Sequence, residues 1–174
     1  MKARLFTALI VMITLTGCMQ MKPTDFKDAK PRFVLEEFFD GQTQASGIFE
    51  DRFGNLRREF TVDINGVWDG KTLILNEEFF YSDGERDSRV WTIEKINDHI
   101  YQGRADDIIG VATGESYGNV LNWQYYMDLK VDDSTIRVHF DDWMYLQPSG
   151  VMLNRAKVSK WGIELGTVTL AFTK

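Results

Sequence analysis

The chain has 174 residues, with 20 basic and 26 acidic side chains, and its net charge is −6 at neutral pH. This is the length of one ordinary domain with a core large enough to fold on its own. The acidic balance argues against nucleic acid as a partner and against electrostatic docking of the whole chain on anionic lipid. A single cysteine excludes an internal disulfide, so core packing has to stabilise the fold.

The first 17 residues have the three parts of an export signal. Lys2 and Arg4 form a basic start, residues 5–15 form an apolar run, and small residues follow. The run is too short to cross a bilayer, because a spanning helix needs about 20 residues. Residues 15–18 (Leu-Thr-Gly-Cys) resemble the bacterial lipobox, which implies cleavage before Cys18 and acylation of its thiol. We therefore predict a signal peptide at residues 1–17 and lipidation at Cys18.

An uncleaved anchor and an ordinary secreted precursor are the alternatives, but residues 15–17 lack the A-x-A-like pattern of ordinary cleavage sites. Met19 stands where lipoproteins retained at the inner membrane carry aspartate, so the resemblance implies an outer-membrane lipoprotein that faces the periplasm. Residues 1–17 hold two of the basic residues and no acidic one, so their removal leaves a net charge of −8. We expect two or more acyl chains such as palmitate, rather than charge, to hold the domain at the membrane.

The mature chain is predicted to begin with a lipidated tether at residues 18–31, followed by a single β-barrel domain at residues 32–174. The tether has two prolines, mixed charges and little periodicity. Residues 32–40 fit either a helical stripe or a strand. We favour a short N-terminal helix that ends at Gly41, because glycine is a common residue just after a helix.

From residue 42 onward, apolar and polar residues alternate with the period of a β-strand. The clearest strand covers residues 120–131. Turn signals separate the strands at residues 53–55, 65–66, 69–70, 82–85, 132–134 and 147–150. About ten short strands at this spacing predict a mainly β protein, an antiparallel up-and-down lipocalin-like barrel. An open, curved sheet with a helix inside it is the alternative.

Two acidic residues fall on apolar faces. Asp142 shares its face with Phe140 and Met144, so either a β-bulge turns it outward or its carboxylate points into the interior. Glu77 lies between Leu75 and Phe79. A buried acid needs hydrogen bonds or a cationic partner.

Arg89 lies on the returning strand of the predicted hairpin that contains Glu77, and it could pair with one of these two acids. A two-residue Asp83-Gly84 loop would place Arg89 opposite Glu78, whereas a longer, odd loop would place it on the face of Glu77. We favour the longer loop because the apolar residues near Glu77 then face inward together with Trp91. The pair could be a structural ion pair that fixes the register, or it could orient a ligand, and both interpretations stay open.

Other motifs have plain structural interpretations. Residues 114–118 fit G-x-S-x-G, but a nucleophile elbow needs a strand, a turn and a helix in a larger fold, so we expect a hairpin turn. His99 and His139 lack the spacing of zinc ligands, and His139 should face solvent. The acid pairs at residues 106–107 and 132–133 should be turn residues, because no calcium-loop pattern surrounds them. We predict no catalytic residue, no metal site and no cofactor.

Several stretches of the mature chain, among them residues 77–85 (EEFFYSDGE) and 141–145 (DDWMY), resemble a family of small uncharacterised proteobacterial lipoproteins. The resemblance implies a lipocalin-like fold and no known activity, although members are often encoded near enzymes that modify fatty acids. Trp161 departs from the pattern, which implies a smaller aromatic residue in this turn. The resemblance rests on residues 77–85 (EEFFYSDGE), Arg89, Trp91, Tyr101, Gly103, Ala105, Gly118, Asn119, residues 141–145 (DDWMY), residues 154–156 (NRA), Ser159 and Lys160.

These features predict a non-enzymatic, membrane-anchored periplasmic lipoprotein that binds or carries a lipid, a fatty acid or another small apolar ligand. The alternative is a structural or assembly protein of the cell envelope, with a barrel filled by its own side chains. Exposed Trp143 and Tyr145 would then bind a protein partner. A hollow interior would separate the two hypotheses. The predicted ligand-binding residues are Glu77, Arg89, Trp91, Trp123, Tyr125 and Asp142.

Overall fold

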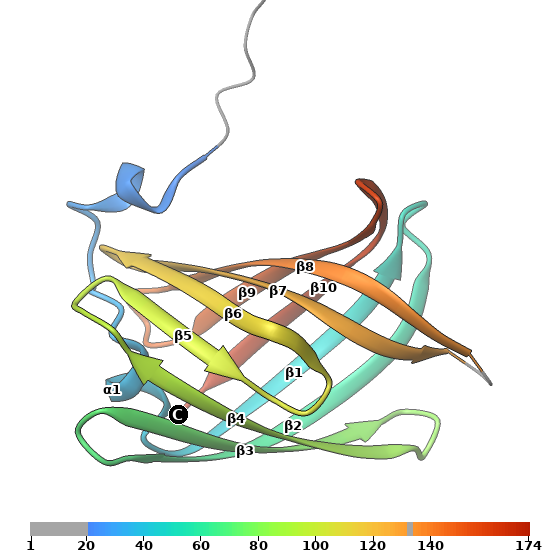
Figure 1. Cartoon of the computed structure of the whole chain (residues 1–174), viewed down its shortest axis with the longest axis horizontal. Coiled ribbons are helices and arrows are strands. Elements are labelled where there is room, and N and C mark those ends of the chain that lie inside the picture. Colours follow the sequence, from blue (N-terminus) through green and yellow to red (C-terminus); the bar gives the residue numbers. More distant parts are fainter. Residues whose placement is uncertain (1–20, 132–133) are drawn as a thin grey trace, which may run out of the picture.

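The fold is seen in a computed structural model that describes residues 21–131 and 134–174. The predicted signal peptide, Cys18 and the acid pair 132–133 lie outside the described residues. The described chain forms a closed barrel of ten antiparallel strands, preceded by two short helical segments (Figure 1). The strands are β1 (Gly41–Asp51), β2 (Leu56–Trp68), β3 (Thr72–Tyr81), β4 (Arg86–Lys95), β5 (Ile100–Arg104), β6 (Ile108–Tyr117), β7 (Val120–Val131), β8 (Ser134–Leu146), β9 (Met152–Lys160) and β10 (Ile163–Thr173).

Each strand pairs with the next strand along the chain, and β1 pairs with β10 to close the barrel. The alternation of residue types explains the closure, because one face of every strand is apolar and turns inward. In β2, for example, Val62 and Ile64 are buried while Thr61 and Asp63 are exposed. The predicted up-and-down barrel is confirmed, and the open-sheet alternative is wrong.

A single helical turn, α1 (Leu35–Phe39), closes one end of the barrel (Figure 1). Leu35, Phe38 and Phe39 are buried, and the Phe39 ring packs edge-on against Phe172 with centroids 5.8 Å apart. Gly41 follows the turn with a φ of 94°, which glycine adopts without strain. The helix predicted over residues 32–40 is therefore reduced to this one turn, and the residues before it are extended.

The expected turn at Asn65 and Gly66 is wrong, because both residues lie inside β2. Gly66 meets the backbone of α1 instead. A Cβ atom at this position would lie 1.8 Å from the Phe39 carbonyl oxygen. Glycine is needed here because helix and strand approach each other closely. In the sequence, an Asn-Gly pair of this kind looks the same as a turn.

The described part of the predicted tether packs on the barrel. The 3₁₀ turn η1 (Pro23–Phe26) places the Phe26 ring 6.3 Å from Trp143 and 6.2 Å from Tyr145. Farther along, the Phe33 amide donates to the Gly118 carbonyl at 2.7 Å. The boundary at residue 31 stays a prediction, but the chain already touches the barrel near residue 23. Neither helical segment in the described residues is long and apolar enough to span a membrane.

Candidate ligand-binding cavity

The barrel encloses a cavity of about 330 Å³. This volume lies in the range of small-molecule sites, about 300–1,000 Å³. Leu35 and Phe39 of α1 line its closed end. Arg58 and Lys130 line the opposite end, and both side chains reach solvent there. Most of the wall between the two ends is aliphatic or aromatic, so the interior suits an apolar molecule.

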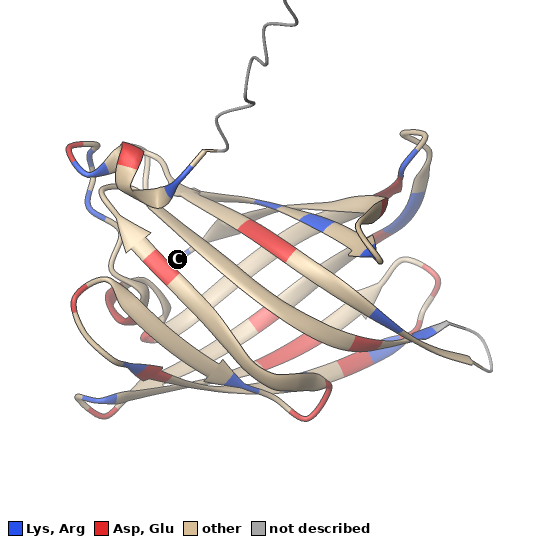
Figure 2. Ribbon diagram, turned by 45° about the horizontal axis from the view of Figure 1, so that its top comes forward, with Lys and Arg blue, Asp and Glu red and all other residues tan. Residues whose placement is uncertain are grey.

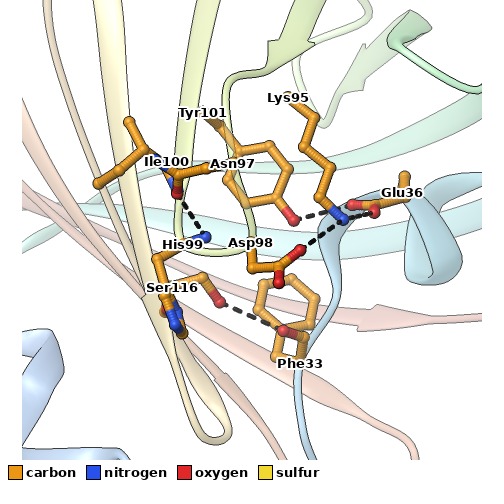
Figure 3. A network of polar contacts seen from close by, with 9 residues as sticks. All are labelled: Phe33, Glu36, Lys95, Asn97, Asp98, His99, Ile100, Tyr101 and Ser116. Carbon is orange, nitrogen blue, oxygen red and sulfur yellow. Dashed lines mark hydrogen bonds and ion pairs between the residues drawn. The ribbon is translucent and has the colours of Figure 1, made fainter.

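A polar network holds the closed end in place (Figure 3). The Lys95 ammonium lies 2.5 Å from the Glu36 carboxylate, and the Tyr101 hydroxyl donates to the same carboxylate at 2.8 Å. Burial would raise the pKa of Glu36, but Lys95 and Tyr101 together lower it. Glu36 is therefore held charged between strands β4 and β5, and α1 is tied to the barrel wall.

Ser116 is part of the same closure and is not placed as a nucleophile. Its Oγ lies 3.2 Å from the Phe33 carbonyl oxygen and 3.1 Å from that of Val120 (Figure 3). Residues 114–117 belong to strand β6, and the hairpin to β7 begins only at Gly118. The G-x-S-x-G stretch thus lacks the strand–turn–helix of a nucleophile elbow. The turn expected over residues 114–118 is also wrong, since most of this stretch is strand.

The two histidines lie away from the cavity. His99 stacks on Tyr117, and its Nδ1 is 2.8 Å from the Ser116 carbonyl oxygen. His139 lies on the outer side of β8 against Tyr126, with ring centroids 4.9 Å apart. Within residues 21–131 and 134–174, no three His, Cys, Asp or Glu side chains are grouped to hold a metal ion.

Three aromatic residues form one wall of the cavity. The Trp91 ring lies edge-on to Trp123 and Tyr125, with centroids 5.7 and 5.5 Å apart. The Trp123 indole covers Gly103 and Gly114, where a Cβ atom would come within 2.5 and 2.3 Å of its carbons. The two glycines in the neighbouring strands therefore make room for the largest side chain of the wall.

The predicted register of the β3–β4 hairpin is confirmed, because the residue opposite Arg89 is Glu77 and not Glu78. The Arg89 guanidinium is 3.8 Å from the Glu77 carboxylate. A closer partner is Asp107, whose Oδ2 accepts a hydrogen bond from Arg89 Nε at 2.9 Å and forms an ion pair with Nη2 at 2.8 Å. Asp107 lies in a turn, as predicted. Its contact with Arg89 was not predicted, because the alternation of apolar and polar residues in strands does not indicate where a turn side chain points.

Burial dominates the electrostatics of this pair. It raises the pKa of Glu77 to about 7, although Arg89 acts in the opposite direction. Burial alone would lower the pKa of Arg89, but Glu77 raises it and the guanidinium stays charged. The cation is thus already neutralised by Asp107, with Glu77 as a second acid beside it.

Asp142 points into the cavity and has unused hydrogen-bonding capacity. It is 7% exposed, and the Tyr125 hydroxyl lies 3.4 Å from its Oδ2. Its Oδ1 is buried with no hydrogen-bond partner in the described residues. Burial, and then the neighbouring charge of Asp141, raise the pKa of Asp142 to about 8. The pairing of β8 with β7 and β9 is regular here, so the β-bulge alternative is wrong.

Asn154 on β9 is a further polar side chain of the cavity wall, and it was not among the predicted site residues. It is 2% exposed, lines the cavity, and its Nδ2 also has no partner among the described residues. The alternation of β9 would have placed it inward, between buried Met152 and Ala156. The six predicted ligand-binding residues all line the cavity: Glu77, Arg89, Trp91, Trp123, Tyr125 and Asp142.

This geometry defines a class, the closed antiparallel up-and-down β-barrels with a hollow, largely apolar interior. Residues 12–174 match a family described as "Protein of unknown function (DUF3833)", and the chain belongs to that family. No curated protein and no solved structure matches the chain. The expected membership in a family of unknown function is confirmed, and the lipoprotein character of the chain stays a prediction.

Proposed function

We propose that the barrel is a non-enzymatic binding or carrier module for a small, largely apolar ligand. The cavity of about 330 Å³ is the observation that carries this proposal. A barrel that served only as a scaffold would gain stability from filling this space with side chains, since empty volume in a core is destabilising. The cavity thus favours the carrier over the filled structural barrel.

The polar groups indicate what the ligand carries at its polar end. Arg89 is already bound by Asp107, so it offers no free cation to a fatty-acid carboxylate. Among the residues that line the cavity, Asp142 Oδ1, Asn154 Nδ2 and Arg58 Nε are buried with no hydrogen-bond partner in the described residues. The Arg58 guanidinium at the open end is already paired with Asp83 and Glu85, which leaves the Asp142 and Asn154 atoms for a polar group of the ligand. With a pKa of about 8, Asp142 is protonated at neutral pH and can donate a hydrogen bond. We infer an apolar ligand with an uncharged oxygen-bearing group, such as an ester or an alcohol, and rank a free fatty acid below it.

Native mass spectrometry of protein purified from its host envelope tests for a bound lipid. Titration of the emptied protein with a fluorescent fatty acid and with its methyl ester then tests the head group. We expect the ester to bind at least about tenfold more tightly at pH 7, which corresponds to about 1.4 kcal/mol. Repeated recovery of empty protein, together with no uptake of either probe, would refute the proposal.

Two neighbouring positions on β7 give matched variants for this titration. Met127 faces the cavity and Tyr126 faces solvent. Met127→Trp should fill part of the cavity and abolish probe binding, whereas Tyr126→Trp should bind as the unchanged protein does. Melting curves of both variants establish that they are folded.

We further propose that Cys18 is acylated and that the acyl chains anchor the barrel at the outer membrane, facing the periplasm. The basic start, the short apolar run and the Leu-Thr-Gly-Cys sequence support this anchor. Two or more acyl chains suffice for stable attachment.

A further inference from the structure

Two hairpin tips at the open end of the barrel expose large apolar side chains. The β1–β2 tip carries Phe53, which is 75% exposed, and Leu56, which is 53% exposed. The β9–β10 tip carries Trp161 and Ile163, which are 89% and 56% exposed. These four side chains are called the rim patch below. Large apolar side chains are normally buried, because removing their surface from water stabilises the protein.

The two tips lie side by side, at the end of the barrel away from α1 (Figure 1). The Arg52 amide donates to the Leu165 carbonyl at 2.9 Å, which joins one tip to the base of the other. Phe49 and Phe60, which line the cavity, stand on the strands just below the first tip. The rim patch is therefore a single surface at the mouth of the cavity.

Trp161 is held in a backbone conformation that does not suit it. Its φ is 51°, and no other non-glycine residue in the described ranges has a positive φ. Gly162 follows with a φ of 79°, so the turn needs two left-handed residues, which Asn-Gly supplies more readily. Because Trp161 is almost fully exposed, packing does not explain it, and a strained, exposed residue of this kind points to a function.

Basic residues accompany the apolar ones. The Arg52 guanidinium lies 4.7 Å from the Phe53 ring centre, and the Lys160 ammonium lies 4.7 Å from that of Trp161. Neither cation forms an ion pair within the part of the chain that the structure describes. Figure 2 shows basic residues on both hairpins. Glu164, next to Ile163, is exposed and has no ion pair in the described residues either, so the two tips carry two unpaired cations beside their aromatic rings and an unpaired acid.

We propose that the rim patch inserts into the headgroup region of an anionic phospholipid bilayer. Tryptophan is enriched at that depth, apolar residues reach the acyl boundary, and lysine and arginine are attracted to anionic headgroups. Docking in this way sets the cavity mouth against the bilayer, so an apolar ligand can pass between them without crossing water. The passage rests on the proposed binding function, whereas docking does not.

The test uses the chain from residue 19 onward, which contains every described element and lacks both the signal and Cys18. Co-sedimentation with phosphatidylethanolamine–phosphatidylglycerol vesicles is compared with phosphatidylcholine vesicles. We expect binding to the anionic vesicles, with a blue shift of tryptophan emission. Phe53→Ser with Trp161→Asn should weaken it at least about tenfold. Val90→Ser with Tyr126→Ser, which removes an aliphatic and an aromatic side chain that are 52% and 54% exposed elsewhere on the barrel, should leave it unchanged.

Trp161→Asn alone separates function from folding. It should melt at the same temperature as the unchanged chain or higher, because asparagine accepts the left-handed conformation, and it should still bind vesicles less tightly. Equal vesicle binding by the unchanged chain and the double rim variant would overturn the proposal. A dimer that the same variants dissociate would overturn it too, because a second copy would then cover the patch. Vesicle binding without ligand uptake would refute the carrier function alone.

Discussion

Arg89 is the residue on which the polar part of the interior depends. It is 17% exposed and stands between Asp107, 32% exposed, and Glu77, 14% exposed. If the guanidinium were removed, Asp107 could turn toward water, but Glu77 would remain in an apolar site. The loss of stability on removing Arg89 therefore depends mainly on Glu77, although the arginine contacts Asp107 more closely.

Arg89→Met should lower the free energy of unfolding by about 3–5 kcal/mol, the usual effect of breaking a buried ion pair from one side. Arg137→Met is the matched control, because Arg137 is 56% exposed and pairs with Asp128 on the outer surface. Its loss should be below about 1 kcal/mol. Adding Glu77→Gln to Arg89→Met should recover part of the loss. Thermal melts of the four proteins decide the matter, and equal small shifts for both arginine variants would mean that Arg89 is solvated.

Asp142 should make the empty protein less stable as the pH rises. Its pKa is about 8 in the folded chain, against 3.8 ordinarily, so the folded state binds the proton more tightly. Stability from this group is complete below about pH 4 and is lost as the pH rises toward 8. Asp142→Asn should remove the fall, raising the melting temperature at pH 8 by roughly 4–8 °C if about 2 kcal/mol is recovered. Asp63→Asn, on the exposed outer face of β2, should leave the fall in stability with pH unchanged. Parallel profiles of melting temperature against pH for Asp142→Asn and the unchanged protein would contradict the role given to Asp142.

At the level of elements, alternation predicted most of the barrel because each strand has one wet and one dry face. It placed Glu77 and Asp142 inward, and it selected the correct register at Arg89. Alternation failed at positions where a neighbouring segment, rather than the pattern of the strand itself, determines which residue fits. Gly66 is small for the sake of α1, and Gly103 and Gly114 are small for the sake of Trp123. Asp107 was missed because a turn side chain has no preferred face.

For the whole molecule, strand periodicity implied a barrel but not its hollowness. The volume of the cavity depends on how side chains from eight of the ten described strands meet, and no local pattern carries that information. The polar network at the closed end could not be predicted from local sequence patterns either. The Glu36–Lys95–Tyr101 network joins residues 59 and 65 positions apart in the chain.

The proposed anchor also acts on the molecule as a whole. Cys18→Ser removes the thiol that would be acylated, so the precursor should stay unprocessed and the domain should leave the outer-membrane fraction. Membrane fractionation and detergent partitioning measure this, with Ser46→Cys in the same background as a control that restores a thiol without the lipobox. Unchanged partitioning of Cys18→Ser would show that something other than acylation holds the protein.

The barrel closure has a consequence for the order of folding. Among the ten described strands, every ladder except one joins strands that are adjacent in the chain, so hairpins can form in sequence as synthesis proceeds. The exception pairs Gln44 in β1 with Thr173 in β10. Until the 11 residues of β10 have been synthesised, the backbone amides and carbonyls along one edge of β1 are unpaired. An unpaired strand edge of this kind can pair with strands of other chains. The C-terminal strand therefore determines when the newly made chain stops being prone to aggregation.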